Sequence, residues 1–152
     1  MELVEGLFPR GIDAPPALSH RADQGFALNA LALAYSESGQ PRIATRLFER
    51  AAPLLADDLL SSIVNRGDLS NSRRLCGELF GAELAVRKSA IDVFALDESD
   101  SVARNFYRIM VMCFLARVLT IRGEWLDAKK LLSRAEKQCH RISNPTFRIP
   151  TP

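Results

Sequence analysis

Three glycines in this chain are followed, at equal distances, by the same kinds of residue. Each precedes an alanine by five residues, a core-sized and then a small residue follow that alanine after four and seven more, and a leucine stands eight residues before the glycine. The three sets are Leu31, Gly39, Ala44, Phe48 and Ala51; Leu69, Gly77, Ala82, Val86 and Ser89; and Leu115, Gly123, Ala128, Leu132 and Ala135. Each set predicts a helix, a glycine turn and a second helix, with the alanine where the two helices cross at close range.

Apolar residues between the proline-containing ends recur every three or four positions, the period of an amphipathic helix. A first helix is expected to stop at Ser38-Gly39, a second to begin at Pro41, and a long one to run from about Val102 to Arg122, with residues 97–101 as its N-terminal cap. The sequence therefore predicts an all-α fold of three antiparallel helix hairpins.

Prolines at both ends divide the chain into three parts. Residues 1–19 are expected to form an N-terminal arm and residues 144–152 a C-terminal tail. Residues 20–143 are expected to form one helical repeat domain, with units at about 23–56, 59–95 and 101–142. The apolar residues of the arm suggest a short helix packed on the body; they are Leu3, Val4, Leu7, Phe8 and Ile12.

The composition narrows the class of function. The 152 residues are 47% hydrophobic and 25% charged, which is typical of one globular domain, and a net charge of +2 gives no basic excess for nucleic acid. The longest apolar run, at 109–116, is far shorter than the ~20 residues that a membrane span needs, and the first residues lack the apolar core of a secretory signal. We therefore expect a cytoplasmic protein that binds neither nucleic acid nor membrane.

Groups suited to catalysis or metal binding are few. The two histidines, His20 and His140, lie at segment ends, and the sequence contains no CxxC, no HxxxH and no phosphate-binding glycine loop. Cys76, Cys113 and Cys139 are an odd number, lie in apolar helical stretches and include no closely spaced pair, so they indicate no disulfide framework. We therefore expect no catalytic residue, no cofactor and no metal site.

The first unit resembles a tetratricopeptide repeat, with leucine in place of the usual tryptophan and alanine in place of the first glycine. The matching residues are Leu28, Leu31, Ala32, Tyr35, Gly39, Ala44, Phe48 and Ala51. Residues 112–135 of the third unit resemble the repeat too, whereas the middle unit has Arg66, Ser70 and Arg73 where apolar or small residues belong. The resemblance implies a short right-handed superhelix of three stacked hairpins.

In tetratricopeptide arrays the first helices of successive hairpins line a concave groove. Carried over by position, the groove residues are Phe26, Asn29, Leu33 and Glu37 in the first unit, Val64, Asn71 and Arg74 in the second, and Met110, Cys113, Arg117 and Thr120 in the third. This mixture suits a peptide whose apolar side chains fill pockets while its carboxylates meet arginine. The lysine-and-asparagine clamp of chaperone cochaperones is missing, because Asn29 and Leu33 occupy the matching positions.

The resemblance therefore implies a non-catalytic scaffold or adaptor that binds a peptide or helical protein partner. A chaperone for secreted translocator-type proteins and a ligand-sensing regulatory module of a larger signalling assembly are the alternatives. An enzyme would require two titratable groups that converge in a pocket. Self-association through the end faces of the array is also open, since an array of only three hairpins exposes apolar ends unless the arm or another copy covers them.

Basic residues gather near the end of the third unit, three or four positions apart, where they would form a ridge on the last helix. They are Lys130, Arg134, Lys137 and Arg141, opposite an apolar stripe of Ala128, Leu131, Leu132 and Ala135. A solvated outer face is the simplest interpretation, and a contact for an acidic partner is the alternative.

Ala44→Leu and Ala128→Leu are each expected to lower the free energy of unfolding by about 1–3 kcal/mol, because a larger side chain at a close helix crossing forces the helices apart. Thermal melts followed by circular dichroism measure the change. If both variants melt at the wild-type temperature, these alanines are not crossing residues and the repeat register is wrong.

Overall fold

The computed structural model describes residues 6–96 and 101–143, with their side chains except at 94–95, 101–103 and 141–143. Within these ranges all regular structure is helical, so the expected all-α class is confirmed. The helices are α2 (Arg21–Glu37), α3 (Pro41–Ala51), α4 (Leu59–Leu75), α5 (Leu79–Ala95), α6 (Ser101–Ile121) and α7 (Trp125–Ser143).

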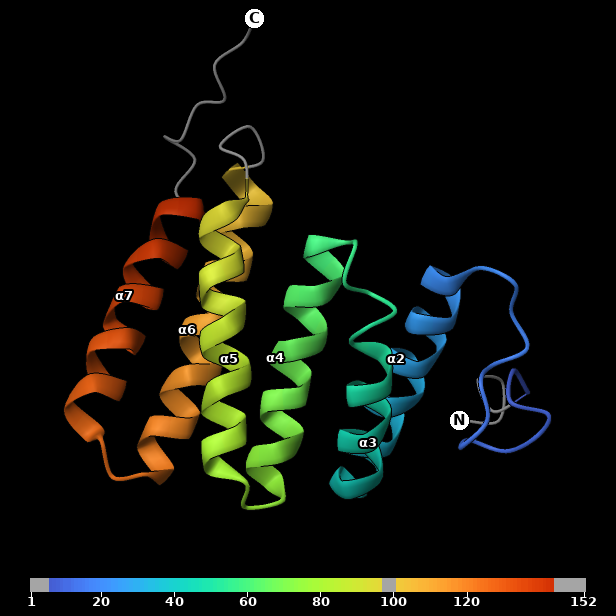
Figure 1. Ribbon diagram of the computed structural model, residues 1–152. Coiled ribbons are helices and arrows are strands. Elements are labelled where there is room, and N and C mark those ends of the chain that lie inside the picture. Colours follow the sequence, from blue (N-terminus) through green and yellow to red (C-terminus); the bar gives the residue numbers. More distant parts are fainter. Residues whose placement is uncertain (1–5, 97–100, 144–152) are drawn as a thin grey trace, which may run out of the picture.

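The helices pack in consecutive pairs. The largest contacts are those of α2 with α3, α4 with α5 and α6 with α7, while α3 with α4 and α5 with α6 join one pair to the next. The first helix of the middle pair, α4, also contacts the first helices of both other pairs, α2 and α6. Figure 1 shows the resulting row, in chain order from α2 and α3 at one end to α7 at the other.

The three predicted glycine turns are present and nearly identical. Gly39, Gly77 and Gly123 have φ values of 79°, 81° and 82°, the left-handed region that L-residues with a side chain rarely adopt. In each turn the residue after the glycine donates its backbone N–H to the carbonyl five residues earlier, at 2.9 Å. Each first helix therefore ends in the same way, and the second helix leaves it in the same direction.

The core consists of two clusters of buried side chains. One is centred on Leu31 and Phe48 of the first hairpin and extends to Leu69 of α4 and Ala85 of α5. The other joins the second and third hairpins around Ile63 and Val86. The crossing alanines Ala44, Ala82 and Ala128 are buried, as the spacing predicts. Leu132, in contrast, is exposed, so the apolar stripe expected on the last helix is wrong at that position.

The N-terminal arm packs on the first hairpin, at the α2 and α3 end of the row (Figure 1). Its Phe8 is only 4% exposed and joins the first core cluster. Arg50 of α3 holds the arm by donating hydrogen bonds to the carbonyls of Ile12 and Ala14. Residues 6–20 make turns, so the expected short helix is wrong for that stretch. Residues 1–5, 97–100 and 144–152, which include most of the expected cap of the long helix and the expected tail, lie outside the described residues.

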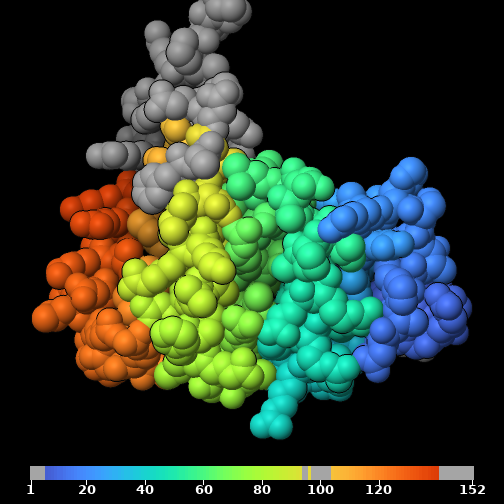
Figure 2. All heavy atoms as spheres, in the orientation of Figure 1, coloured from blue at the N-terminus to red at the C-terminus, as the bar shows by residue number. Residues whose placement is uncertain are grey.

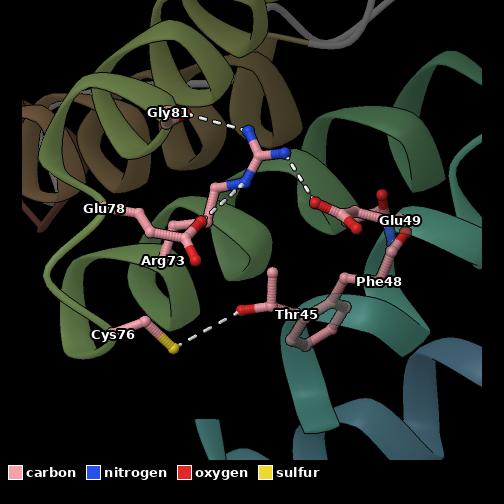
Figure 3. Close-up of polar contacts among 8 residues, drawn as sticks. Thr45, Phe48, Glu49, Arg73, Cys76, Glu78 and Gly81 are labelled. Carbon is pink, nitrogen blue, oxygen red and sulfur yellow. Dashed lines mark hydrogen bonds and ion pairs between the residues drawn. The ribbon is translucent and has the colours of Figure 1, made fainter. Parts of the chain in front are cut away.

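Arg73 of α4 stands where the repeat pattern predicts an apolar or small side chain, and it joins three helices instead (Figure 3). Its guanidinium donates to Glu49 Oε1 of α3 at 2.7 Å and to the carbonyl of Gly81 of α5 at 3.2 Å, and it lies 3.9 Å from Glu78 Oε2. Arg66, at another such position, pairs with Asp92 of α5. Polar contacts thus replace part of the expected apolar packing in the middle hairpin.

Gly77→Ala is expected to lower the free energy of unfolding by about 1–2 kcal/mol, because alanine is strained at positive φ. A Cβ at this position would meet no atom within 4 Å, so the loss reports on backbone conformation and not on packing. Gly77→Asn is the matched control and should lose less, since asparagine tolerates the left-handed region better. Denaturant melts of the three proteins measure both effects, and equal losses for alanine and asparagine would contradict the explanation.

Candidate functional site

The candidate site is the surface that α2, α4 and α6 form together, called the first-helix face below. Its central helix carries Asp68, Asn71 and Arg74 at steps of three residues, and such steps turn about 60° around a helix. The charge of Glu37, at the end of α2, acts on Asp68, and the charge of Arg117, on α6, acts on Arg74. Asp68 therefore lies on the α2 side of α4 and Arg74 on the α6 side, with Asn71 between them.

A hollow of about 200 Å³ opens on this face near the first turns of the three helices. Phe26 and Asn29 of α2, Val64 of α4 and Tyr107 of α6 contribute to its walls. Three residues predicted from the repeat positions, Phe26, Asn29 and Val64, therefore meet in one place. The remaining described lining residues are Leu55, Leu60 and Ser61.

Asn29 is held in place by an amide contact beneath the hollow. The side chain of Asn65, which is fully buried, donates to Asn29 Oδ1 at 2.9 Å and to the carbonyl of Phe48 at 3.2 Å. Asn65 thereby joins α2, α3 and α4 at one point. Phe26 is free to meet a ligand, because it is 53% exposed at the edge of the hollow.

Next to the hollow, the first-helix face is closed at its base because α4 packs tightly on α6. A Cβ added at Gly67 would lie 2.9 Å from a ring carbon of Phe114 and 3.5 Å from the terminal methyl carbon of Met110. The side chains of Phe114 and Met110 on α6 therefore lie against Gly67, where α4 has no side chain. Met110, predicted as a groove residue, is half-buried in this contact and offers a ligand only part of its surface.

The carboxylate of Asp68 on α4 is partly buried and is affected by the charge of Glu37 on α2. Burial, and to a lesser extent the negative charge of Glu37, raises the pKa of Asp68 to about 6. Among the described residues none donates a hydrogen bond to the Asp68 carboxylate or pairs with it. Sequence analysis did not place Asp68 in the groove, although its position between Val64 and Asn71 on one helical face was a usable signal.

Two arginines form the corresponding pair across α4 and α6. Arg74 donates to Asn71 Oδ1 at 2.8 Å, and burial, with a further contribution from the positive charge of Arg117, lowers the pKa of its guanidinium. Arg117 is exposed, with its guanidinium carbon 5.7 Å from the centre of the Phe114 ring. Neither arginine makes a salt bridge within the described part of the chain.

The remaining predicted residues contribute less. Leu33 is exposed on α2, and Cys113 is half-buried on α6 with a free thiol. Thr120 donates its hydroxyl to the carbonyl of Ala116 in its own helix, at 2.8 Å, so that proton is already used.

The arrangement can bind charge, since carboxylates and guanidiniums form strong hydrogen bonds with groups of opposite charge. In the ranges 6–96 and 101–143 no cluster of three or more histidine, cysteine, aspartate or glutamate side chains is placed to hold a metal ion. The described helices are also too short or too polar to cross a membrane. Comparison of the chain with protein-family models, with curated proteins and with solved structures gave no match.

Asp68→Asn is expected to stabilise the fold by about 1–3 kcal/mol at pH 8, because each unit of pKa shift corresponds to about 1.4 kcal/mol. The raised pKa means that the folded chain binds a proton more tightly than the unfolded chain does. Wild type therefore regains stability as the pH falls from above 6 towards 4, and the advantage of the variant should vanish there. Melting temperatures between pH 4 and pH 8 test this, with Asp57→Asn in an exposed turn as the control; an advantage that does not change with pH would contradict it.

Proposed function

We propose that this protein is a non-catalytic adaptor that binds an extended or helical peptide segment of a protein partner on the first-helix face. The observation that carries the proposal is the hollow in which Phe26, Asn29 and Val64 meet. Two like-charge pairs lie on the same face, Glu37 with Asp68 and Arg74 with Arg117, and neither receives a counter-charge from the described residues. Ionisable groups held in unfavourable surroundings are characteristic of functional sites.

The repulsion within these two charge pairs favours the binding of a ligand that relieves it. Holding like charges near one another, one of them on a desolvated carboxylate, destabilises the folded chain. A ligand that places a basic side chain beside Asp68 and an acidic side chain beside Arg74 relieves both repulsions and adds charge-assisted hydrogen bonds. Asp68 and Arg74 are six residues apart on α4, which is about 9 Å along the axis at 1.5 Å per residue, so one short peptide segment reaches both.

The hollow supplies an apolar anchor for the same segment. Its exposed Phe26 and the neighbouring Val64 and Tyr107 suit one aliphatic or aromatic side chain, and the fixed amide of Asn29 offers a polar contact beside it. The proposed ligand thus combines an apolar residue, a basic residue and an acidic residue, in that order from the hollow to the arginines.

A tetratricopeptide-type superhelix, with the first-helix face as its concave side, is part of the proposal. It is supported by three turns with the same hydrogen bond, by the buried crossing alanines and by the contacts of α4 with both α2 and α6. Three free cysteines favour a reducing compartment and support the expected cytoplasmic location.

The decisive experiment selects binding peptides from a displayed random library and then changes the arginines. Peptides selected on wild type should carry an acidic and a basic residue, and Arg74→Glu with Arg117→Glu should weaken their binding at least tenfold by fluorescence anisotropy, because attraction to the acidic residue becomes repulsion. The matched control, Arg42→Glu with Lys129→Glu, makes the same change of charge at exposed positions on α3 and α7.

Circular dichroism melts on the same preparations separate binding from folding. The proposal expects the arginine variant to keep its melting temperature while losing affinity. Equal affinity of this variant and wild type, or an equal loss in the control variant, would overturn the first-helix face as the binding site.

A further inference from the structure

We infer that the pocket between α5, α6 and α7 is a second binding site, for a small amphiphilic carboxylate of the medium-chain alkanoate class. The helices α5 and α7 both pack on α6 but make no close backbone contact with one another in the described residues. Their side chains therefore leave a gap above α6. Figure 2 shows the face of the molecule on which α5, in yellow-green, and α7, in orange-red, both lie.

The pocket is large enough for a small molecule. Its volume is about 470 Å³, which lies within the range of ligand sites in proteins. Apolar side chains from two helices form the inner wall: Ala90 and Val93 of α5, and Val111 and Met112 of α6. Val93 and Val111 are buried members of the core, so this wall is fixed, whereas the flexible Met112 adapts to the shape of an inserted chain.

Positive charge lies at the opposite wall of the pocket. Arg134 and Lys137 are neighbours on one face of α7, and neither makes a hydrogen bond or salt bridge with any other described residue. Arg108 of α6 also lines the pocket, and the described lining residues include no carboxylate. Gln138 donates to Asn105 Oδ1 at 2.6 Å, a contact that joins α7 to α6 beside the two cations.

This combination determines the class of ligand. Two cations beside an apolar wall attract an anion with an apolar body, because the carboxylate gains charge-assisted hydrogen bonds while its chain leaves water. Part of the basic ridge noted in the sequence, Arg134 and Lys137, thus borders a pocket. The site is separate from the first-helix face, and the inference does not rest on the proposed function.

The two internal methionines make the inference testable by NMR of methyl-labelled protein. Met112 lines the pocket, whereas Met110 lies against Gly67 on the first-helix face. Titration with decanoate should shift the Met112 methyl signal in a saturable way and leave the Met110 signal unchanged. Met112→Leu assigns the signals.

Two variants and two further probes test the role of charge. Arg134→Gln with Lys137→Gln should weaken decanoate binding at least tenfold, whereas Lys88→Gln with Lys129→Gln, which removes the same charge at exposed positions outside the pocket, should not. Decanol and decyltrimethylammonium should bind wild type at least tenfold more weakly than decanoate.

Four results would overturn the inference. They are the absence of a Met112 shift, equal shifts of Met110 and Met112, unchanged affinity in the Arg134 and Lys137 variant, and decanol binding as tight as that of decanoate. Circular dichroism melts of both double variants must match wild type. If the Arg134 and Lys137 variant does not, it is replaced by Arg134→Lys with Lys137→Met. This replacement keeps one of the two charges and should show an intermediate affinity.

Discussion

The backbone conformation of three glycines determines how the rest of this structure is arranged. Positive φ at Gly39, Gly77 and Gly123 lets each first helix close with the same hydrogen bond and reverse direction within a few residues. The second helix then packs on the first with a small residue, Ala44, Ala82 or Ala128, buried between them. Because the same reversal occurs three times, the first helices come to lie near one another, and the surface they share depends on these turns.

The elements that sequence predicted well are those set by local chemistry. A glycine after a helix fixes where that helix ends, and Pro41 fixes where α3 begins. These helix boundaries can therefore be predicted from the sequence to within a few residues. The arm was predicted less well. Phe8 is buried because it meets the first hairpin, and a segment held by tertiary packing and by Arg50 needs no helix of its own.

The residues of the candidate site also differ in how well the sequence predicts them. Phe26, Asn29 and Val64 follow from a position in the repeat and do meet in one hollow, whereas the importance of Asp68 arises from burial and from a charge on another helix. The spacing of residues along the chain does not predict that Glu37 of α2 lies near Asp68. Arg73 shows the converse, since a residue that departs from the apolar pattern finds its partners, Glu49 and the carbonyl of Gly81, on adjacent helices.

The position of the arm makes the two ends of the row unequal, which restricts the symmetry of any self-association. The arm covers the α2 and α3 end, while at the other end α7 carries Trp125 and Leu126, exposed by 66% and 77%. A head-to-tail contact would join this exposed end of one copy to the arm-covered end of the next, and such contacts build rings or filaments. A contact that used the α7 end of both copies would instead join like surfaces about a two-fold axis, and it would close as a dimer.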